Sequence, residues 1–360
     1  MARLANHSNA RVSTPTSEIP MTTAERVDVS ILIVSYNTRA MTLAALDSVA
    51  AETRDVTYEV IVVDNASHDG SAAAIAAHPS KPRLIALKEN IGFARANNLA
   101  AEEAHGAYVL LLNSDTVVLD RAIDKLVSFA RRNRRALVWG GRTVVADGRL
   151  NPGSCWGRLT PWNLFCRVSG LTSIFPRSEL FNGESIGCWP RNTAREVDIV
   201  SGCFLLIPRA IWLALGGFDP IFFMYGEDAD LCLRAARLGA RPMITPEATI
   251  IHHGGASEPV LARKLIKLLA AKSSLIDRHW PMPLRVPGQY LLALWPASRW
   301  VALSTWSVLT GCASAHATAE VWREVWNARI QWRFGYAKAA PIEAEIAASA
   351  PLLAQLHSIS

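Results

Sequence analysis

The chain has 360 residues, half of them hydrophobic, which is enough for one large domain with a smaller appendage. Its formal net charge of +6 is compatible with nucleic acid, anionic lipid or phosphorylated substrates and selects none of them. The six cysteines form no Cys-x-x-Cys pair and lack zinc-site spacing, so we expect buried, reduced thiols. The N-terminal segment lacks the apolar core of a secretory signal, so we expect a cytoplasmic protein.

Residues 1–27 are polar and predict a disordered arm. Beyond them, four apolar, β-branched runs alternate with Ala-rich stretches that favour helix. This alternation predicts a parallel sheet flanked by helices, in which ligands bind beyond the carboxyl ends of the strands. The predicted strands are 29–36, 58–65, 82–89 and 107–114.

Residues 140–200 are rich in Gly, Pro, Trp and Arg and predict long loops. A second ordered stretch follows them. It predicts a strand over 197–208, a helix over 226–239 that ends at a glycine, and a further strand over 241–253.

The chain changes character again over 258–338, where a basic run precedes the apolar, Trp-rich stretch 288–311. That stretch is long enough to span a bilayer, but Pro296 and Arg299 lie near its middle. We therefore expect peripheral attachment to the inner face of the cell membrane, with an ordinary pair of packed helices as the alternative. Residues 339–360 predict a frayed C-terminal tail.

Motifs of several enzyme classes are absent from the sequence. No Gly-x-Gly-x-x-Gly follows the first strand and no Gly-x-x-x-x-Gly-Lys occurs, which disfavours a dinucleotide oxidoreductase and a P-loop enzyme. His-Glu-x-x-His and Gly-x-Ser-x-Gly are also missing. No nucleic-acid-binding module accompanies the basic charge, so we expect no nucleic-acid partner.

Polar residues at the predicted strand ends are the candidates for chemistry. Asn113 and Asp115 follow an apolar strand, and their hard oxygens suit Mg²⁺ or Mn²⁺, although Asn, Ser and Asp also favour turns and caps. Asp64 either caps the helix that begins near Asp69 or hydrogen-bonds a base or ribose edge. Residues 90–98 open a helix whose free amides, with Arg95, suit phosphate or form a simple capped helix.

Two further groups lie later in the chain. Glu227 and Asp228 begin a helix, where acids satisfy the helix dipole or supply a general base. His252 and His253 end a strand before a glycine pair, which favours a ligand role modestly over a structural one.

Six segments, taken in order, resemble a family 2 glycosyltransferase of the bacterial rhamnosyltransferase-like group. They are ILIVSYN, VIVVDNAS, ENIGFARANN, LLLNSD, VSGCFLLIPRAIWLALGGFDPIFFMYGEDADLCLR and IIHHGGAS, and the resemblance covers 29–257. It implies a GT-A (nucleotide-diphospho-sugar transferase) catalytic domain over 28–257, an α/β fold with a mostly parallel central sheet flanked by helices. The region 258–338 is then a C-terminal helical appendage. The resemblance also implies inverting transfer of a sugar, with rhamnose as a candidate, in polysaccharide or glycolipid synthesis.

The resemblance also implies roles for single residues. Asp64 is expected to contact the base, Asp228 to be the general base beside Glu227, and His252 to complete a Mg²⁺ or Mn²⁺ site with Asn113 and Asp115. Asn113 stands where the family has the first Asp of Asp-x-Asp, which removes one negative charge from the site. The residues expected to bind substrate are Ser35, Tyr36, Asn37, Asp64, Asn90, Gly92, Phe93, Arg95, Asn97 and Asn113.

The expected partners are a dTDP- or UDP-sugar donor and a glycan or lipid-linked glycan acceptor. Two alternatives stay open. A sugar nucleotidyltransferase shares the α/β frame, but it typically carries a Gly-rich loop after its first strand, where this chain has SYNTRAM. A non-catalytic paralogue that serves as a scaffold in glycan assembly is disfavoured by the intact acidic pair.

Overall fold

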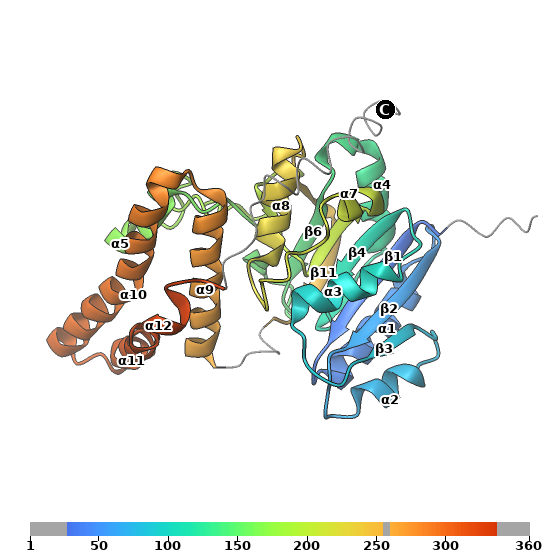
Figure 1. Cartoon of the computed structure of the whole chain (residues 1–360), viewed down its shortest axis with the longest axis horizontal. Coiled ribbons are helices and arrows are strands. Elements are labelled where there is room, and N and C mark those ends of the chain that lie inside the picture. The colour runs from blue at the N-terminus through green and yellow to red at the C-terminus, as the bar shows by residue number, and fades with distance from the viewer. Residues whose placement is uncertain (1–26, 255–259, 337–360) are drawn as a thin grey trace, which may run out of the picture.

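The computed structural model describes residues 27–254 and 260–336, so the arm 1–26, residues 255–259 and the tail beyond 336 lie outside it. Within those residues a nine-stranded sheet carries helices on both faces, and a separate group of helices stands beside it (Figure 1). The strands are β1 (Val29–Ser35), β2 (Tyr58–Asp64), β3 (Arg83–Ala86), β4 (Tyr108–Leu112), β5 (Thr116–Val118), β6 (Trp139–Val144), β7 (Cys155–Trp156), β8 (Arg195–Glu196), β9 (Ile199–Val200), β10 (Phe204–Pro208) and β11 (Met243–His252).

The helices cover the sheet and form the C-terminal group. They are α1 (Arg39–Glu52), α2 (Ser71–Ala76), α3 (Phe93–Glu102), α4 (Ala122–Arg132), α5 (Pro161–Ser169), α6 (Leu171–Ile174), α7 (Arg209–Ala214), α8 (Glu227–Arg237), α9 (Leu261–His279), α10 (Met282–Thr310), α11 (Ala313–Asn327) and α12 (Arg329–Trp332). Two short 3₁₀ turns cover Arg134–Ala136 and Pro152–Ser154.

The N-terminal half of the sheet is parallel, as the strand–helix alternation predicts. The sheet order is β3-β2-β1-β4-β10-β6-β11-β5, with β8 beside β11. β1 pairs in parallel with β2 and β4, whereas β10 lies antiparallel between β4 and β6. The carboxyl ends of β1, β2, β4 and β11 therefore meet at one edge of the sheet, because β6 and β11 run in the same direction as β4.

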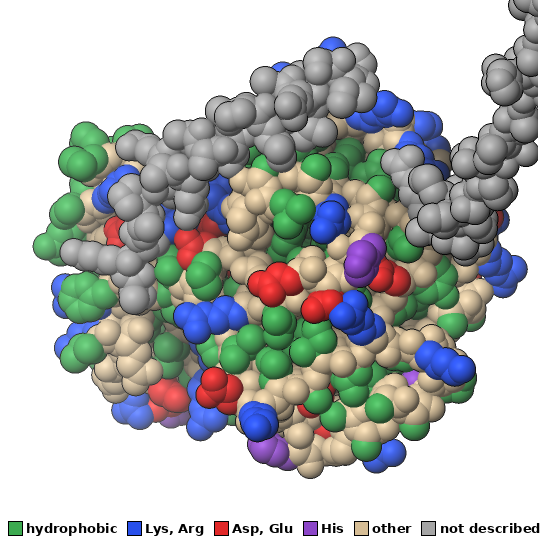
Figure 2. All heavy atoms as spheres, turned by 45° about the vertical axis from the view of Figure 1, so that its right-hand side comes forward, with side chains coloured by type: hydrophobic (Ala, Val, Ile, Leu, Met, Phe, Trp, Pro, Cys, Tyr) green, Lys and Arg blue, Asp and Glu red, His purple; other side chains and the backbone are tan. Residues whose placement is uncertain are grey.

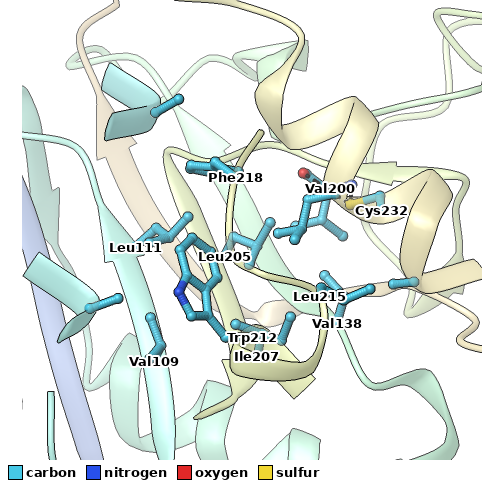
Figure 3. Packing of buried hydrophobic residues seen from close by; sticks show 14 of the residues in the cluster. Val109, Leu111, Val138, Val200, Leu205, Ile207, Trp212, Leu215, Phe218 and Cys232 are labelled. Atoms are coloured by element: carbon cyan, nitrogen blue, oxygen red, sulfur yellow. Dashed lines mark hydrogen bonds between the residues drawn. The ribbon is translucent and has the colours of Figure 1, made fainter. Parts of the chain in front are cut away.

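Burial on both faces explains why these runs are almost continuously apolar. β4 and β10 pack their alternate side chains, Val109, Leu111, Leu205 and Ile207, against α7 and α8 on one face of the sheet (Figure 3). A second cluster fills the opposite face under α1 and α4. These two layers hold the strand ends in fixed positions.

The structure differs from the sequence prediction in three respects. Strand β5 and helix α4, which follow β4 in that order, were not predicted from the sequence. The buried face of α4 nevertheless has helical spacing, with Ile123, Leu126, Val127 and Ala130. The region 140–200 is more ordered than its composition predicts, because it contains β6, α5 and α6. Of the six cysteines, all free, Cys188 is exposed, contrary to the expectation of buried thiols.

The C-terminal helices α9–α12 pack around their own core and against α5. Trp280, Leu292, Trp295 and Trp332 are buried in that core. Within the described residues, no helix is long and apolar enough to cross a membrane. Residues 288–310 of the predicted apolar stretch lie within α10, a longer helix that contains Pro287 and Pro296 and ends before Gly311.

Candidate active site

Residues 113–115 form a turn between β4 and β5, rather than the extended segment that their spacing suggests. β5 then pairs antiparallel with β11, with Thr116 opposite His252. This register brings the end of β11 beside the turn, although the two segments are far apart in the sequence.

Three predicted metal ligands meet at this turn. His252 Nε2 lies 3.3 Å from Asn113 Nδ2 and 3.4 Å from Asp115 Oδ1. Asp115 Oδ2 accepts a hydrogen bond of 3.0 Å from the Gly254 N–H, and the Asp115 carbonyl accepts one from the His253 N–H. Within the described residues, the buried atoms Asn113 Oδ1 and His252 Nδ1 have no hydrogen-bond partner.

The donor set fits a divalent cation in chemistry. It offers an amide oxygen, a carboxylate and an imidazole, which suit Mg²⁺ or Mn²⁺ with remaining positions left for substrate phosphates. The described residues contain no cluster of three His, Cys, Asp or Glu placed around one point, so the fit depends on Asn113.

Charges in this cluster are coupled. Although burial raises the pKa of Asp115, the hydrogen bond and charge of His252 lower it below its ordinary value. Burial lowers the pKa of His252, but nearby Cys203 and Asp115 outweigh burial and raise it to about 10. Without a cation the ring is therefore a proton-bearing partner of Asp115.

Asp64 ends β2 and is 2% exposed. Its Oδ2 accepts a 3.1 Å hydrogen bond from the Ser67 N–H, and its buried Oδ1 has no partner among the described residues. The residue that precedes α2 is Gly70, and the first N–H of that helix, from Ser71, donates to Asp69 Oδ1 rather than to Asp64. Asp64 therefore does not serve as the helix cap, and one of its oxygens stays free for another group.

Asn90 and Gly92 form a bend that Asn65 holds in place. Asn65 Nδ2 donates to Asn90 Oδ1 at 2.9 Å, and Asn65 Oδ1 accepts from the Ile91 N–H. Gly92 has φ +85°, and a Cβ there would lie 2.6 Å from the Phe223 carbonyl oxygen. This bend is therefore pressed against the loop 218–223, and only glycine fits at its centre.

Glu227 and Asp228 begin α8 behind Gly226, whose φ is +92°. Asp228 Oδ2 accepts a 3.1 Å hydrogen bond from the Gly202 N–H, and its Oδ1 accepts from the Ala229 N–H. The Asn113 N–H in turn donates to the carbonyl of Cys203. Asp228 and Asn113 therefore contact adjacent residues of one turn, which links the acidic pair to the His252 cluster.

The two acids have different surroundings. Glu227 is buried and its Oε2 has no partner among the described residues, whereas Asp228 is partly exposed. Burial, with the neighbouring Asp228 charge, raises the pKa of Glu227 well above its ordinary value. Burial also raises the pKa of Asp228, against the lowering effect of its hydrogen bonds from Gly202 and Ala229. A raised pKa makes a carboxylate a better proton acceptor near neutrality.

Several predicted binding residues have partners within the chain. The Ser35 hydroxyl is fully buried and bonds Thr42, and Asn97 Nδ2 donates to the Phe93 carbonyl of its own helix. Arg95 Nε donates to the Pro220 carbonyl. These contacts hold α1, α3 and the loop 218–223 around the site.

The other predicted residues lie at its rim. Tyr36 is half-buried, and Asn37 is exposed with its Oδ1 accepting from the His68 N–H. Phe93 is half-buried and lies 6.1 Å from Phe218 between ring centroids.

Sequence reasoning missed several residues that shape the site. Asn98 pairs with both backbone groups of Phe218, and the N–H of Gly202 holds Asp228. The available signals are that Asn98 follows the predicted residue Asn97 and that Gly202 lies in one of the segments that carry the family resemblance.

Of two cavities in the described residues, one adjoins this region and the other does not. One, of about 350 Å³, is lined by Asn90, Arg95, Pro220 and Phe223 and so adjoins the bend and the loop 218–223. The other, of about 380 Å³, lies at the start of β11, away from the strand ends, and its arginines pair with acids. Figure 2 shows acidic side chains and a histidine gathered near the middle of one face, with hydrophobic side chains between them.

The chain resembles a solved structure over most of its length. The mannosyltransferase PcManGT from Pyrobaculum calidifontis, in complex with GDP-Man and Mn2+, matches with a TM-score of 0.50 and 18% identity, covering 91% of this chain and 87% of that chain. The sheet order, the helices on both faces and this match define a GT-A fold.

The family follows from sequence. The model described as Glycosyl transferase family 2 matches residues 30–182. The succinoglycan biosynthesis protein ExoO of Rhizobium meliloti is 35% identical, with 70% of this chain aligned to 69% of that protein. The chain belongs to glycosyltransferase family 2.

Two other relatives have names that bear on the pathway. The O-antigen biosynthesis protein RfbC of Myxococcus xanthus is 31% identical over 63% of this chain, which spans only 17% of that protein's length. An N-acetylglucosaminyl-diphospho-decaprenol L-rhamnosyltransferase of Mycobacterium tuberculosis is 29% identical, over 65% of this chain and 81% of that protein.

Proposed function

We propose that this chain transfers a sugar, with L-rhamnose as the first candidate, from a nucleoside-diphosphate donor to a hydroxyl of a lipid-linked glycan. The observation that carries the proposal is the convergence of Asp64, the Asn113–Asp115–His252 cluster and Asp228 at one edge of the sheet. The name of the mycobacterial relative supports a rhamnosyl donor and a polyprenyl-diphosphate acceptor.

The donor is assigned to the carboxyl ends of the strands in the N-terminal half of the sheet. The unpartnered Oδ1 of Asp64 is the acceptor for an N–H of the base. The bend at Asn90 and Gly92 forms the adjoining wall. Asn113, Asp115 and His252 are the residues that would hold a divalent cation. Such a cation stabilises the negative charge that develops on the leaving diphosphate.

The acceptor hydroxyl is assigned to Asp228. An alcohol is too weak an acid to ionise beforehand, so its proton moves to the carboxylate as the new glycosidic bond forms. The raised pKa of Asp228 suits this transfer, and the hydrogen bonds from Gly202 and Ala229 fix its orientation. Attack opposite the departing nucleotide inverts the anomeric centre.

The test measures sugar transfer to a polyprenyl-diphosphate N-acetylglucosamine acceptor with dTDP-rhamnose and a panel of UDP-sugars. We expect Asp228→Asn to lower turnover by about 10²–10⁴-fold, because it removes basicity but keeps size, with donor affinity almost unchanged. We expect activity to be lost in excess EDTA and restored by Mn²⁺ or Mg²⁺.

Glu324→Gln, an exposed change on α11, is the control and should keep full activity. Transfer by Asp228→Asn at the parental rate would overturn the base assignment, and full activity in EDTA would overturn the metal. A parent that binds no sugar nucleotide in thermal-shift assays and transfers nothing would favour the scaffold alternative. Formation of a sugar nucleotide from sugar phosphate and a nucleoside triphosphate would favour the nucleotidyltransferase.

A further inference from the structure

Exposed large hydrophobic side chains are concentrated in one part of the described chain. Only Met41, Leu213 and Phe223 lie outside the ranges 162–180 and 260–334. The sheet domain thus hides its apolar side chains as a soluble domain does, while the C-terminal helices and the adjoining α5–α6 segment leave theirs in contact with solvent. Exposed apolar side chains mark an interaction site where they form a continuous patch.

Helix α10 carries the longest run of them. Val286, Tyr290, Leu294, Val301 and Val308, here called the α10 stripe, are 51–85% exposed. Their spacing of four or seven residues places them on one helical face, about 33 Å long at 1.5 Å per residue. The opposite face buries Leu292 and Trp295 against neighbouring helices. The core of the C-terminal helices is therefore formed by the opposite face of α10, and the residues of the stripe are not needed to fill it.

Basic residues outnumber acidic ones in this region, although two of them, Lys272 and Arg278, pair with acids of other segments, which are Glu184, Asp219 and Asp230. Residues 260–336 contain ten Lys or Arg and three acids, an excess of seven, whereas the whole chain has an excess of six. No acid occurs between Asp277 and Glu320, the stretch that contains all of α10. At the end of the bundle, Arg329 stacks on Trp326 and Arg333 on Phe334, with Phe334 exposed.

We propose that the α10 stripe docks on the surface of an anionic lipid bilayer, with α10 lying along the membrane plane. Apolar side chains then enter the headgroup boundary while the basic residues face acidic lipid headgroups. Since no described helix is long and apolar enough to cross a membrane, a surface-lying arrangement accounts for the stripe. The stripe and the charge carry this proposal; the assigned catalytic roles do not enter it.

A second copy of the chain is a less favourable occupant. A two-fold interface through the stripe would bring together two regions that each carry an excess of basic residues, and like charges oppose such contacts. An anionic bilayer instead matches both the apolar and the basic character. If the acceptor is lipid-linked, docking also brings the acceptor to the catalytic domain.

The test is flotation of the full chain with vesicles of phosphatidylcholine alone or mixed with phosphatidylglycerol, at low and high salt. We expect binding to the mixed vesicles that weakens with salt. Tyr290→Ser, Leu294→Ser and Val301→Ser combined should weaken it by on the order of tenfold or more, because each substitution removes apolar burial. Met41→Ser with Leu213→Ser, which removes exposed apolar side chains of the sheet domain, should bind as the parent does.

Thermal unfolding and circular dichroism are measured on each variant to show that its fold is intact. Failure of the parent to bind either kind of vesicle, or parental binding by the triple variant, would overturn the proposal. A dimer in light scattering that the triple variant dissociates would assign the stripe to a second copy. Vesicle binding that appears only after removal of residues 337–360 would show that this segment, rather than a membrane, is the occupant of the stripe in the full chain, and would overturn the proposal. No outcome of flotation depends on sugar transfer, so this proposal and the proposed function fail separately.

Discussion

At the scale of single residues, the candidate site contains several buried polar atoms that have no hydrogen bond among the described residues. Asp64, Asn113, Glu227 and His252 each bury a polar atom that has no hydrogen bond within the described residues. Such atoms cost free energy in a folded chain, and ligands are a common reason for their retention. Eight other described residues, most of them arginines, also bury such atoms elsewhere in the fold. The grouping of these four at one end of the sheet, rather than the lack of a partner alone, is what points to a bound ligand.

The sequence alone identified these residues, but it did not predict the side-chain directions of other residues in the same segments. Ser35 and Asn97 belong to the same predicted segments, yet their side chains point into the fold and bond Thr42 and the Phe93 carbonyl. Position at a strand end or helix start predicts proximity to a site. The direction of a side chain depends on packing by α1 and α3, which no local pattern encodes.

Glu227→Gln should change the dependence of stability on pH. The pKa of Glu227 is raised in the folded chain, so its protonated form is favoured there, and the parent loses stability as pH rises from about 4.5, the ordinary value, through the raised pKa. Glutamine does not titrate. The melting temperature of the variant relative to the parent should therefore increase with pH over that window.

Thermal unfolding across this pH range measures the effect, with the exposed Glu324→Gln as the matched control. A melting-temperature difference that stays constant with pH would show that Glu227 does not titrate differently on folding. Turnover of Glu227→Gln should fall less than that of Asp228→Asn, because the two side chains project about a hundred degrees apart on α8.

At the scale of elements, the strands of the parallel half were predictable because strands that are buried on both faces consist almost entirely of apolar residues. The single strand predicted over 197–208 was wrong, because a turn divides this run into β9, which pairs with β7, and β10, which lies antiparallel to β4. The apolar run carries no information about the neighbours of either strand. The meeting of β5 and β11, which joins Asp115 to His252, is a long-range pairing of the same kind. Family resemblance, rather than periodicity, placed His252 in the predicted site.

Gly92→Ala tests the contact between the bend and the loop 218–223. A Cβ at residue 92 would lie 2.6 Å from the Phe223 carbonyl and 2.7 Å from its ring, at a φ of +85°. We expect a loss of stability of about 1–3 kcal/mol and a weaker donor affinity, because the bend must move away from the loop. Urea unfolding and donor titration measure the two effects.

Gly148→Ala is the control, because its φ is also positive but a Cβ there would meet no atom within 4 Å. It should show the backbone strain without the loss of donor affinity. Equal donor affinity in Gly92→Ala and the parent would contradict a role for this bend in the donor site.

For the whole molecule, the C-terminal helices are joined to α8, the helix that begins with the acidic pair, through buried charges. Asp230, on α8, accepts hydrogen bonds from Arg234 at 2.7 Å and from Arg278 at 3.0 Å, and it lies 2.9 Å from His279 Nε2. Burial raises the pKa of Asp230, but His279, Arg234 and Arg278 outweigh it and hold the pKa far below its ordinary value. The appendage predicted from sequence is therefore a structural support of the site.

Arg278→Met should reveal whether this support reaches the chemistry. Arg278 on α9 pairs with Asp230 and, at 2.7 Å, with Asp219 in the loop that borders the bend. Its removal leaves buried acids short of a partner, and loss of one member of a buried pair typically costs about 3–5 kcal/mol. Because both acids flank Glu227 and Asp228, we expect turnover to fall even where the variant remains folded.

Urea unfolding and transfer assays measure the two effects of Arg278→Met. Exposed Arg263→Met, on the same helix, is the control. Arg278→Lys is expected to recover part of the stability. If Arg278→Met loses stability but keeps full turnover at temperatures where it is folded, the C-terminal helices hold the fold together without positioning the acidic pair.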